Sequence, residues 1–151
     1  MRAINHALTG ALIGLSIGQP VVALPVALAS HFVCDVIPHY GANLSRADEM
    51  KSKFFQRLLL PDALLCLALV VVLAVRHPVH WEVAAICAFL AASPDLASIG
   101  QFRRVNNHKT LQPGAYVRFA NGIQWFERPI GAVVEAAWLI GAIILLLPFL
   151  R

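Results

Sequence analysis

The chain has 151 residues, of which 59% are hydrophobic and 13% charged, and its formal net charge is +4. Its mean hydropathy is +0.71, whereas soluble domains carry about 25% charged and roughly 45–50% apolar residues. This composition excludes a disordered chain, a secreted disulfide scaffold and a conventional cytosolic enzyme. It predicts a small polytopic membrane protein with a single integral membrane helical domain over residues 1–151. The positive charge is typical of basic cytoplasmic loops, so nucleic acid is not an expected partner.

Apolar segments in chain order predict an all-α bundle of about five helices. They cover residues 4–17, 20–38, 54–76, 78–98 and 129–150. A Gly-Gln-Pro turn at 18–20 divides the first two segments. If residues 7–30 instead formed one span, the chain would cross the membrane four times and not five. The first segment is short, so it either spans fully or re-enters, and its small residues predict close packing on a neighbouring helix: Ala7, Gly10, Ala11, Gly14 and Gly18.

Lysine and arginine are distributed unequally between the two sides of the five-segment topology. With Met1 in the cytoplasm, the outer side holds Arg76 and Arg151 alone. The inner side holds the other ten: Arg2, Arg46, Lys51, Lys53, Arg57, Arg103, Arg104, Lys109, Arg118 and Arg128. This asymmetry predicts a multi-pass protein of the cell (inner) membrane with a cytoplasmic N-terminus.

Two inner loops, 39–53 and 99–128, offer room for extended polar chemistry. The second is basic and aromatic and has no acidic residue between Asp95 and Glu127. It is expected either to lie on the headgroups of membrane lipids or to bind an anionic headgroup or substrate through Arg103, Arg104 and His108.

Ionisable residues within apolar segments are costly and therefore indicate function. The topology places most of them at one depth, near the inner side: His6, His31, Asp35, His39, Asp62, Asp95, Glu127 and Glu135. His31, Asp35 and His39 are spaced i, i+4 and i+8, which is one face of a continuous helix. The structural alternative is that Asp35, Asp62 and Glu135 pair with Arg57 or Arg128 and hold the bundle together, and that Asp95 caps a helix.

Imidazoles and carboxylates from several helices suit a divalent metal, most of all Zn²⁺. The predicted ligands are His6, His31, Asp35 and His39. Asp62, Asp95 and Glu135 are the predicted catalytic carboxylates, which complete the metal sphere or act as general base.

The stretch from Ser30 to Gly41, with its SHxxxD element followed by Pro and Gly, resembles the small bacterial and archaeal membrane-bound metal-dependent hydrolases. The histidine before the glycine-rich first helix, His6, is similar to one in that family. Leu60-Pro61-Asp62 and Ser93-Pro94-Asp95 both resemble its Leu-Pro-Asp motif, and Trp125-Phe126-Glu127-Arg128 resembles an element before its last helix. An HRxxTHS-like element of the family is missing. The resemblance implies metal-dependent hydrolysis and names no substrate.

Two functions of different class therefore remain. The first is a membrane-embedded metal-dependent hydrolase acting at the cytoplasmic leaflet on a lipid-linked ester or phosphoester. The alternative is a non-catalytic membrane subunit that binds a protein partner or a cofactor such as haem, with His6 and His31 as axial ligands. A small proton-coupled transporter is less favoured, because transport sites lie near the membrane midplane.

Overall fold

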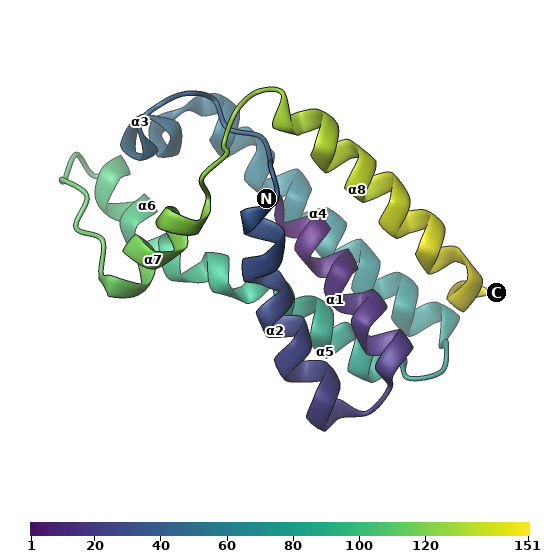
Figure 1. The fold of residues 1–151 in the computed structure, drawn as a ribbon. Coiled ribbons are helices and arrows are strands. Elements are labelled where there is room, and N and C mark those ends of the chain that lie inside the picture. The colour runs from purple at the N-terminus through teal and green to yellow at the C-terminus, as the bar shows by residue number, and fades with distance from the viewer.

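The computed structural model describes residues 1–151 and confirms the all-α fold, with 77% of the residues in helices and no strands. Figure 1 shows the elements arranged as a helical bundle with a smaller helical region at one end. The α-helices are α1 (Ala3–Ile17), α2 (Pro20–Val36), α3 (Arg46–Lys51), α4 (Lys53–Arg76), α5 (Trp81–Ala92), α6 (Ile99–Asn106), α7 (Ala115–Ile123) and α8 (Gly131–Leu146). Two 3₁₀ turns complete the fold, η1 (Ser93–Ser98) and η2 (Leu147–Leu150).

The apolar helices run up and down, so that α1, α4 and α8 begin at the end of the bundle where α2 and α5 finish (Figure 1). A left-handed residue, Gly18, turns the chain between α1 and α2, and residues 7–30 therefore do not form one helix. At the opposite end, the Arg76 guanidinium donates hydrogen bonds to the Leu150 carbonyl and joins α4 to η2.

The short helix α1 lies at the centre of the bundle and packs against α2, α4, α5 and α8. Its closest neighbour is α5, because a Cβ at Gly10 would overlap the Cys87 carbonyl and one at Gly14 would overlap the Ala84 backbone. The predicted small-residue stripe thus does pack tightly on a neighbouring helix, as such stripes do between membrane helices.

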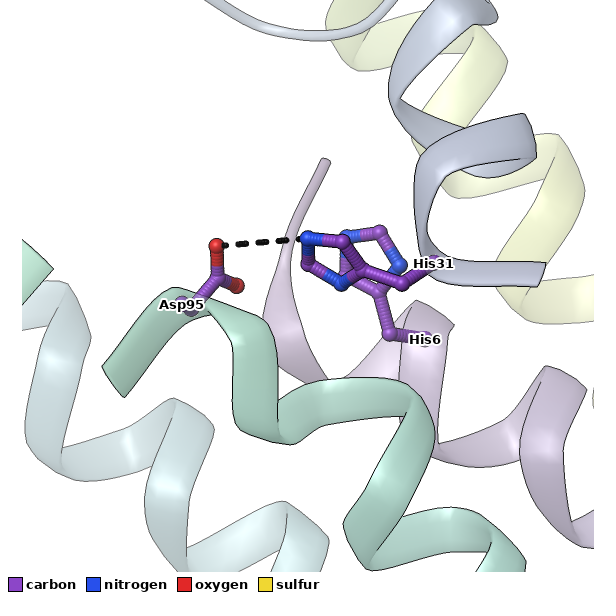
Figure 2. Close-up of side chains that lie close together, drawn as sticks. All are labelled: His6, His31 and Asp95. Carbon is purple, nitrogen blue, oxygen red and sulfur yellow. Dashed lines mark ion pairs between the residues drawn. The ribbon is translucent and has the colours of Figure 1, made fainter. Parts of the chain in front are cut away.

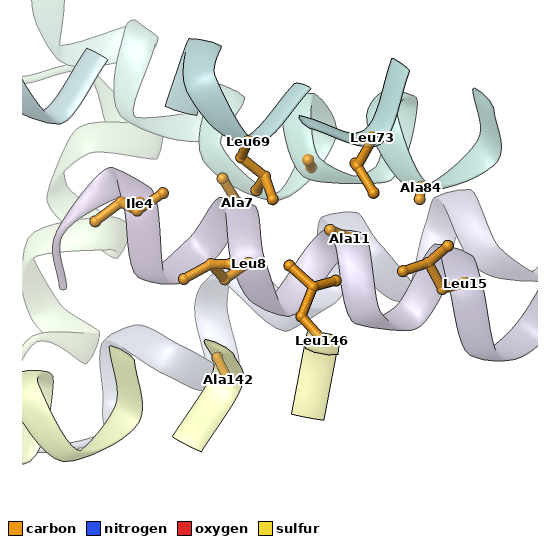
Figure 3. Packing of buried hydrophobic residues seen from close by; sticks show 11 residues of the cluster. Ile4, Ala7, Leu8, Ala11, Leu15, Leu69, Leu73, Ala84, Ala142 and Leu146 are labelled. Atoms are coloured by element: carbon orange, nitrogen blue, oxygen red, sulfur yellow. The ribbon is translucent and has the colours of Figure 1, made fainter. Parts of the chain in front are cut away.

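The hydrophobic core surrounds α1 (Figure 3). Its eleven buried residues come from four helices and are Ile4, Ala7, Leu8, Ala11, Leu15, Leu69, Leu73, Ala84, Ala88, Ala142 and Leu146. Small residues dominate on α5 and leucines on α4, which fits the close α1–α5 contact and the wider α1–α4 contact. The core therefore fixes the position of the first turn of α1, where His6 lies.

Three helical stretches are long and apolar enough to cross a membrane: Lys53–Arg76, Trp81–Asn106 and Gly131–Leu150. The helices α1 and α2 are also apolar but shorter, with 15 and 17 residues. Only 30 of the 151 residues are buried, and large hydrophobic side chains cover the outer surfaces of α4 and α8. An exposed apolar surface of this extent marks contact with lipid or with another protein.

The two predicted polar loops contain short helices. In the first, Ser45 is the N-cap of α3, and its side chain accepts a hydrogen bond from the Asp48 amide. In the second, the helical path of α5 continues through η1 into α6, so the helical stretch runs beyond residue 98, the predicted end of the fourth apolar segment. Pro94 stands at the start of the 3₁₀ turn, where its missing N–H is tolerated.

Candidate functional site

Two histidines and an aspartate from three elements meet at the end of the bundle where the N-terminus lies. His6 comes from the first turns of α1, His31 from the end of α2 and Asp95 from η1, and Figure 2 shows Asp95 facing the two stacked rings. The ring centroids are 4.2 Å apart, and Asp95 Oδ1 lies 3.8 Å from His31 Nε2. One ligand atom from each residue lies within 4.8 Å of the other two. Both histidines are buried, whereas the Asp95 side chain is 45% exposed, so the site opens at Asp95.

A second carboxylate, that of Asp35 on α2, lies close to the Nε2 atoms of the same two rings. Its Oδ1 is 3.2 Å from His6 Nε2 and its Oδ2 is 3.4 Å from His31 Nε2. The i, i+4 spacing of His31 and Asp35 on α2 thus produces the predicted convergence. Asp35 Oδ1 also accepts a hydrogen bond from the terminal ammonium of Met1 at 2.7 Å. We call His6, His31, Asp35 and Asp95 the histidine–aspartate cluster.

Hydrogen bonding defines the proton position on His31. Its Nδ1 lies 2.8 Å from the Ala91 carbonyl, which only accepts, so Nδ1 carries the proton. In the neutral ring, Nε2 then presents its lone pair to Asp35 and Asp95. Histidines that bind metals are oriented in this way, with the other ring nitrogen donating to a carbonyl or carboxylate.

Neither buried ring nitrogen of His6 makes a hydrogen bond of good geometry, although Nε2 lies 3.2 Å from Asp35 Oδ1. Buried polar atoms are satisfied in most proteins, so each unsatisfied one requires an explanation. Here lone pairs and two carboxylates converge on one small volume, an arrangement that a cation stabilises. The mixed nitrogen and oxygen donors fit Zn²⁺ or a similar divalent ion. They do not fit haem between the two histidines, because the rings stack face to face and leave no room for a macrocycle.

Asp62 and Glu135 occupy a different place from the one expected of catalytic groups. Asp62 of α4 accepts hydrogen bonds from the Ala3 amide at 3.0 Å and the Ile4 amide at 3.3 Å. Glu135 of α8 accepts a hydrogen bond from the Arg2 amide at 2.9 Å. The first turn of a helix has amide groups without partners in the helix itself, and these two carboxylates satisfy three of them.

Neither Asp62 nor Glu135 forms an ion pair with a histidine; the ion-pair partner of Asp62 is Arg2. Their arrangement supports α1 and not the histidine–aspartate cluster. The structural alternative placed them against Arg57 or Arg128, but their partners are the backbone at the start of α1. Two negative charges at a helix N-terminus also interact favourably with the helix dipole.

His39 does not join the other predicted metal ligands. The helix α2 ends at Val36, because Pro38 disfavours helical geometry at Ile37, whose ψ is 140°. The i+8 position therefore leaves the helical face. His39 Nδ1 donates to the Ile37 carbonyl at 2.8 Å, and its Nε2 lies 3.5 Å from Glu127 Oε1.

The segment around Glu127 is held to the His39 segment by backbone contacts. His39 donates to the Phe126 carbonyl, and Arg128 donates to the His39 carbonyl, each at 3.2 Å. Burial alone would raise the pKa of Glu127, but the neighbouring His39 ring and the Arg46 guanidinium outweigh it and lower that pKa below its ordinary value. Arg46 Nη1 lies 3.2 Å from Glu127 Oε1.

Arg103, Arg104 and His108, the predicted anion-binding residues, lie at the end of α6 and in the loop that follows it. None of them contacts the histidine–aspartate cluster, and neither arginine has an acidic partner. The one side-chain hydrogen bond among them runs from Arg104 Nε to the Thr110 carbonyl at 3.4 Å.

Gln124 is the residue that sequence reasoning missed. Its Nε2 donates to Asp35 Oδ2 at 2.8 Å, and its Oε1 accepts from Arg46. Gln124 thereby links the histidine–aspartate cluster to Arg46 and, through it, to Glu127. The only signal in the sequence was its position directly before Trp125, the first residue of the element that resembles one in the hydrolase family.

Comparison with models of protein families, with curated proteins and with solved structures finds no match to this chain. The arrangement of the residues themselves is therefore the basis for a functional proposal.

Proposed function

We propose that this protein is an integral membrane, metal-dependent hydrolase that acts at the cytoplasmic leaflet on a lipid-linked ester or phosphoester. Three apolar helices of membrane-spanning length and the exposed hydrophobic surfaces of α4 and α8 support the membrane location. The cationic residues support the orientation, since the end of the bundle with the N-terminus carries ten of the twelve lysines and arginines.

The observation that carries the proposal is the histidine–aspartate cluster. Two buried imidazoles, of which His6 makes no hydrogen bond of good geometry, face one buried and one exposed carboxylate, which is a costly arrangement inside an apolar bundle. His6, His31 and Asp95 would hold the metal, with Asp35 beside them. A bound divalent ion would supply Lewis-acid polarisation of a carbonyl or phosphoryl oxygen.

The residues of the chain have separate tasks in this proposal. Ala91 orients His31 by accepting its Nδ1 proton. Gln124 orients Asp35 by donating to Oδ2. Asp95 would complete the donor set at the open side, where a substrate can reach the metal. Arg103, Arg104 and His108 attract an anionic headgroup to this surface.

Elemental analysis of the detergent-purified protein tests the proposal without an assay of activity. We expect about one zinc, manganese or iron per chain, the stoichiometry of a single site. The double variant His31→Ala/Asp35→Ala should lose the metal. A matched control, His77→Ala/Glu82→Ala, removes one histidine and one acid at the opposite end and should keep it.

Thermal unfolding gives a second readout on the same preparations. A ligand that binds only the folded state stabilises it by mass action, so a chelator should lower the Tm of the wild type and leave the Tm of the double variant unchanged. Absence of metal from folded wild-type protein would contradict the proposal. The cluster would then be a set of helix-packing groups in a non-catalytic membrane subunit.

A further inference from the structure

Two apolar grooves flank α8, because α1 is the one apolar helix of the bundle with which α8 makes extended contact. The groove on one side has a volume of about 360 Å³ and is lined by α1 and α8. The groove on the other side also involves α4 and has a volume of about 240 Å³. Ligand pockets have volumes of roughly 300–1,000 Å³. Only the first groove reaches that size.

We call this first cavity the Thr9 groove. Thr9 and Leu12 of α1 and Val134, Trp138, Gly141 and Leu145 of α8 are among its lining residues. Its polar atoms are already satisfied, since Trp138 Nε1 donates to Thr9 Oγ1 at 3.0 Å and Thr9 Oγ1 donates to the Asn5 carbonyl at 2.8 Å. No charged side chain lines it. The Thr9 groove is therefore suited to a hydrocarbon chain and not to a polar group.

The Thr9 groove begins close to the histidine–aspartate cluster. Thr9 follows His6 by three residues on α1, and Cys34 follows His31 by three residues on α2. The Cys34 Sγ and Thr9 Oγ1 atoms are 3.9 Å apart, so the two helices touch at this level. The groove is thus displaced from the cluster by one helical turn, about 5 Å along the axis.

The surface around the Thr9 groove indicates its occupant. Val133, Ile140 and Ile144 project from α8 as exposed hydrophobic side chains beside it. In the proposed membrane orientation, these residues face lipid, and the groove opens sideways into the same hydrocarbon layer. A chain entering there would place the polar part of its lipid at the depth of His6 and Asp95.

We infer that the Thr9 groove binds the hydrocarbon chain of a membrane lipid and that the substrate of the protein is such a lipid, entering sideways from the bilayer. This inference rests on the proposed function and specifies its substrate class. The scissile ester or phosphoester lies next to the headgroup, within reach of the cluster, while the chain extends along α1 toward Leu145.

Trp138 can report on occupancy of the groove. In the background Trp81→Phe/Trp125→Phe, Trp138 is the remaining tryptophan. The full chain is placed in phosphatidylcholine nanodiscs that contain rising fractions of phosphatidylglycerol with brominated acyl chains, which quench tryptophan on contact. A reference protein carries Trp138→Phe and Ile140→Trp in the same background and reports on ordinary surrounding lipid. Trp138 quenching should saturate at a severalfold lower fraction of brominated lipid than quenching of the reference.

Filling the groove should abolish that difference. Gly141 lines the groove, and a Cβ added there meets no atom within 4 Å, so Gly141→Leu is the first filling variant. Ala137→Leu is a second filling variant. Ala68→Leu fills the smaller groove and is the matched control. Both filling variants should lose saturable quenching of Trp138, and the control should retain it.

Three outcomes would overturn the inference. Quenching could remain saturable in both filling variants, or Ala68→Leu could lose it to the same extent. The filling variants could also convert a dimer to a monomer in light scattering, which would identify a second copy as the occupant. Metal content of the same preparations separates the two proposals. Bound metal without saturable quenching would support the hydrolase and contradict lipid binding in the groove. Saturable quenching without metal would support lipid binding and contradict the hydrolase.

Discussion

Two groups of carboxylates at the same end of the bundle have different partners. At the start of α1, Asp62 and Glu135 accept hydrogen bonds from three backbone amides. One turn further along the same helix, Asp35 and Asp95 face the ring nitrogens of His6 and His31. The first group is satisfied by the fold itself. The second gathers two imidazoles and two carboxylates in one place, with Met1 and Gln124 as the hydrogen-bond donors to Asp35.

The comparison shows that depth in an apolar bundle does not decide the role of an acidic residue. All four carboxylates lie toward the N-terminal end of the bundle, and two of them follow a proline in a Pro-Asp pair. Asp62 on α4 accepts hydrogen bonds from the backbone at the start of α1, whereas Asp95 on η1 faces the histidines. Packing of α1 at the centre of the bundle creates this division, because its free amide groups must find acceptors away from water.

The largest effect on stability is expected from Asp62→Ala/Glu135→Ala. This variant leaves three amide groups without acceptors, and each buried unsatisfied group costs about 1–3 kcal/mol. The free energy of unfolding in detergent should therefore fall by at least about 3 kcal/mol. Asp62→Asn/Glu135→Gln keeps oxygen acceptors and should lose less. A folded alanine variant of normal Tm that has lost its metal would reverse the roles assigned to the two groups.

Asp95→Asn is expected to show the opposite pattern. Asp95 is half-exposed and makes no hydrogen bond, so its replacement should change stability by no more than about 0.5 kcal/mol. Loss of an anionic ligand should weaken metal binding by about tenfold or more, as measured by competition with a chelator, and should abolish hydrolysis. Glu82→Gln removes an exposed acid at the other end of the bundle and should leave the affinity unchanged.

Gln124→Ala is expected to produce an intermediate effect. Gln124 touches Asp35 and no other member of the cluster, so it acts by positioning that carboxylate. Partners behind a metal ligand contribute about 10–100-fold in affinity, and we expect about tenfold here. Asn121→Ala removes a different acceptor of Arg46, with no contact to Asp35, and is the matched control. Equal metal affinity in both variants would show that Gln124 does not position Asp35.

Much of the cluster could be predicted from spacing alone. The i, i+4 pair of His31 and Asp35 needs only a regular helix, and the up-and-down order of the segments brings His6 and Asp95 to the same end. The prediction for His39 was wrong in its geometry because it extended this helix past Val36, although Pro38 stood two residues later. The local rule for the residue before proline outweighed the periodicity.

The roles of Asp62, Glu135 and Gln124 depend on tertiary contacts that no local pattern contains. Asp62 meets α1 across 58 or 59 positions and Glu135 across 133. Gln124 reaches Asp35 across 89 positions from the end of a short amphipathic helix. Spacing along one helix predicts which residues share a face, but the partner of that face is set by which helix occupies the centre of the bundle.

The smallest effect is expected at Glu127, outside both groups. Because its pKa in the folded protein is lowered, the charged form stabilises the fold above the ordinary value of 4.5, and this contribution is lost as the pH falls below that value. Glu127→Gln should therefore lower the free energy of unfolding by about 1 kcal/mol near neutral pH, and the difference from wild type should shrink in acid. Thermal unfolding of both proteins across this pH range measures the difference.

The metal content of Glu127→Gln should equal that of the wild type, since Glu127 reaches the cluster only through Arg46 and Gln124. A loss of metal in this variant would show that the two polar loops and the cluster form one coupled site.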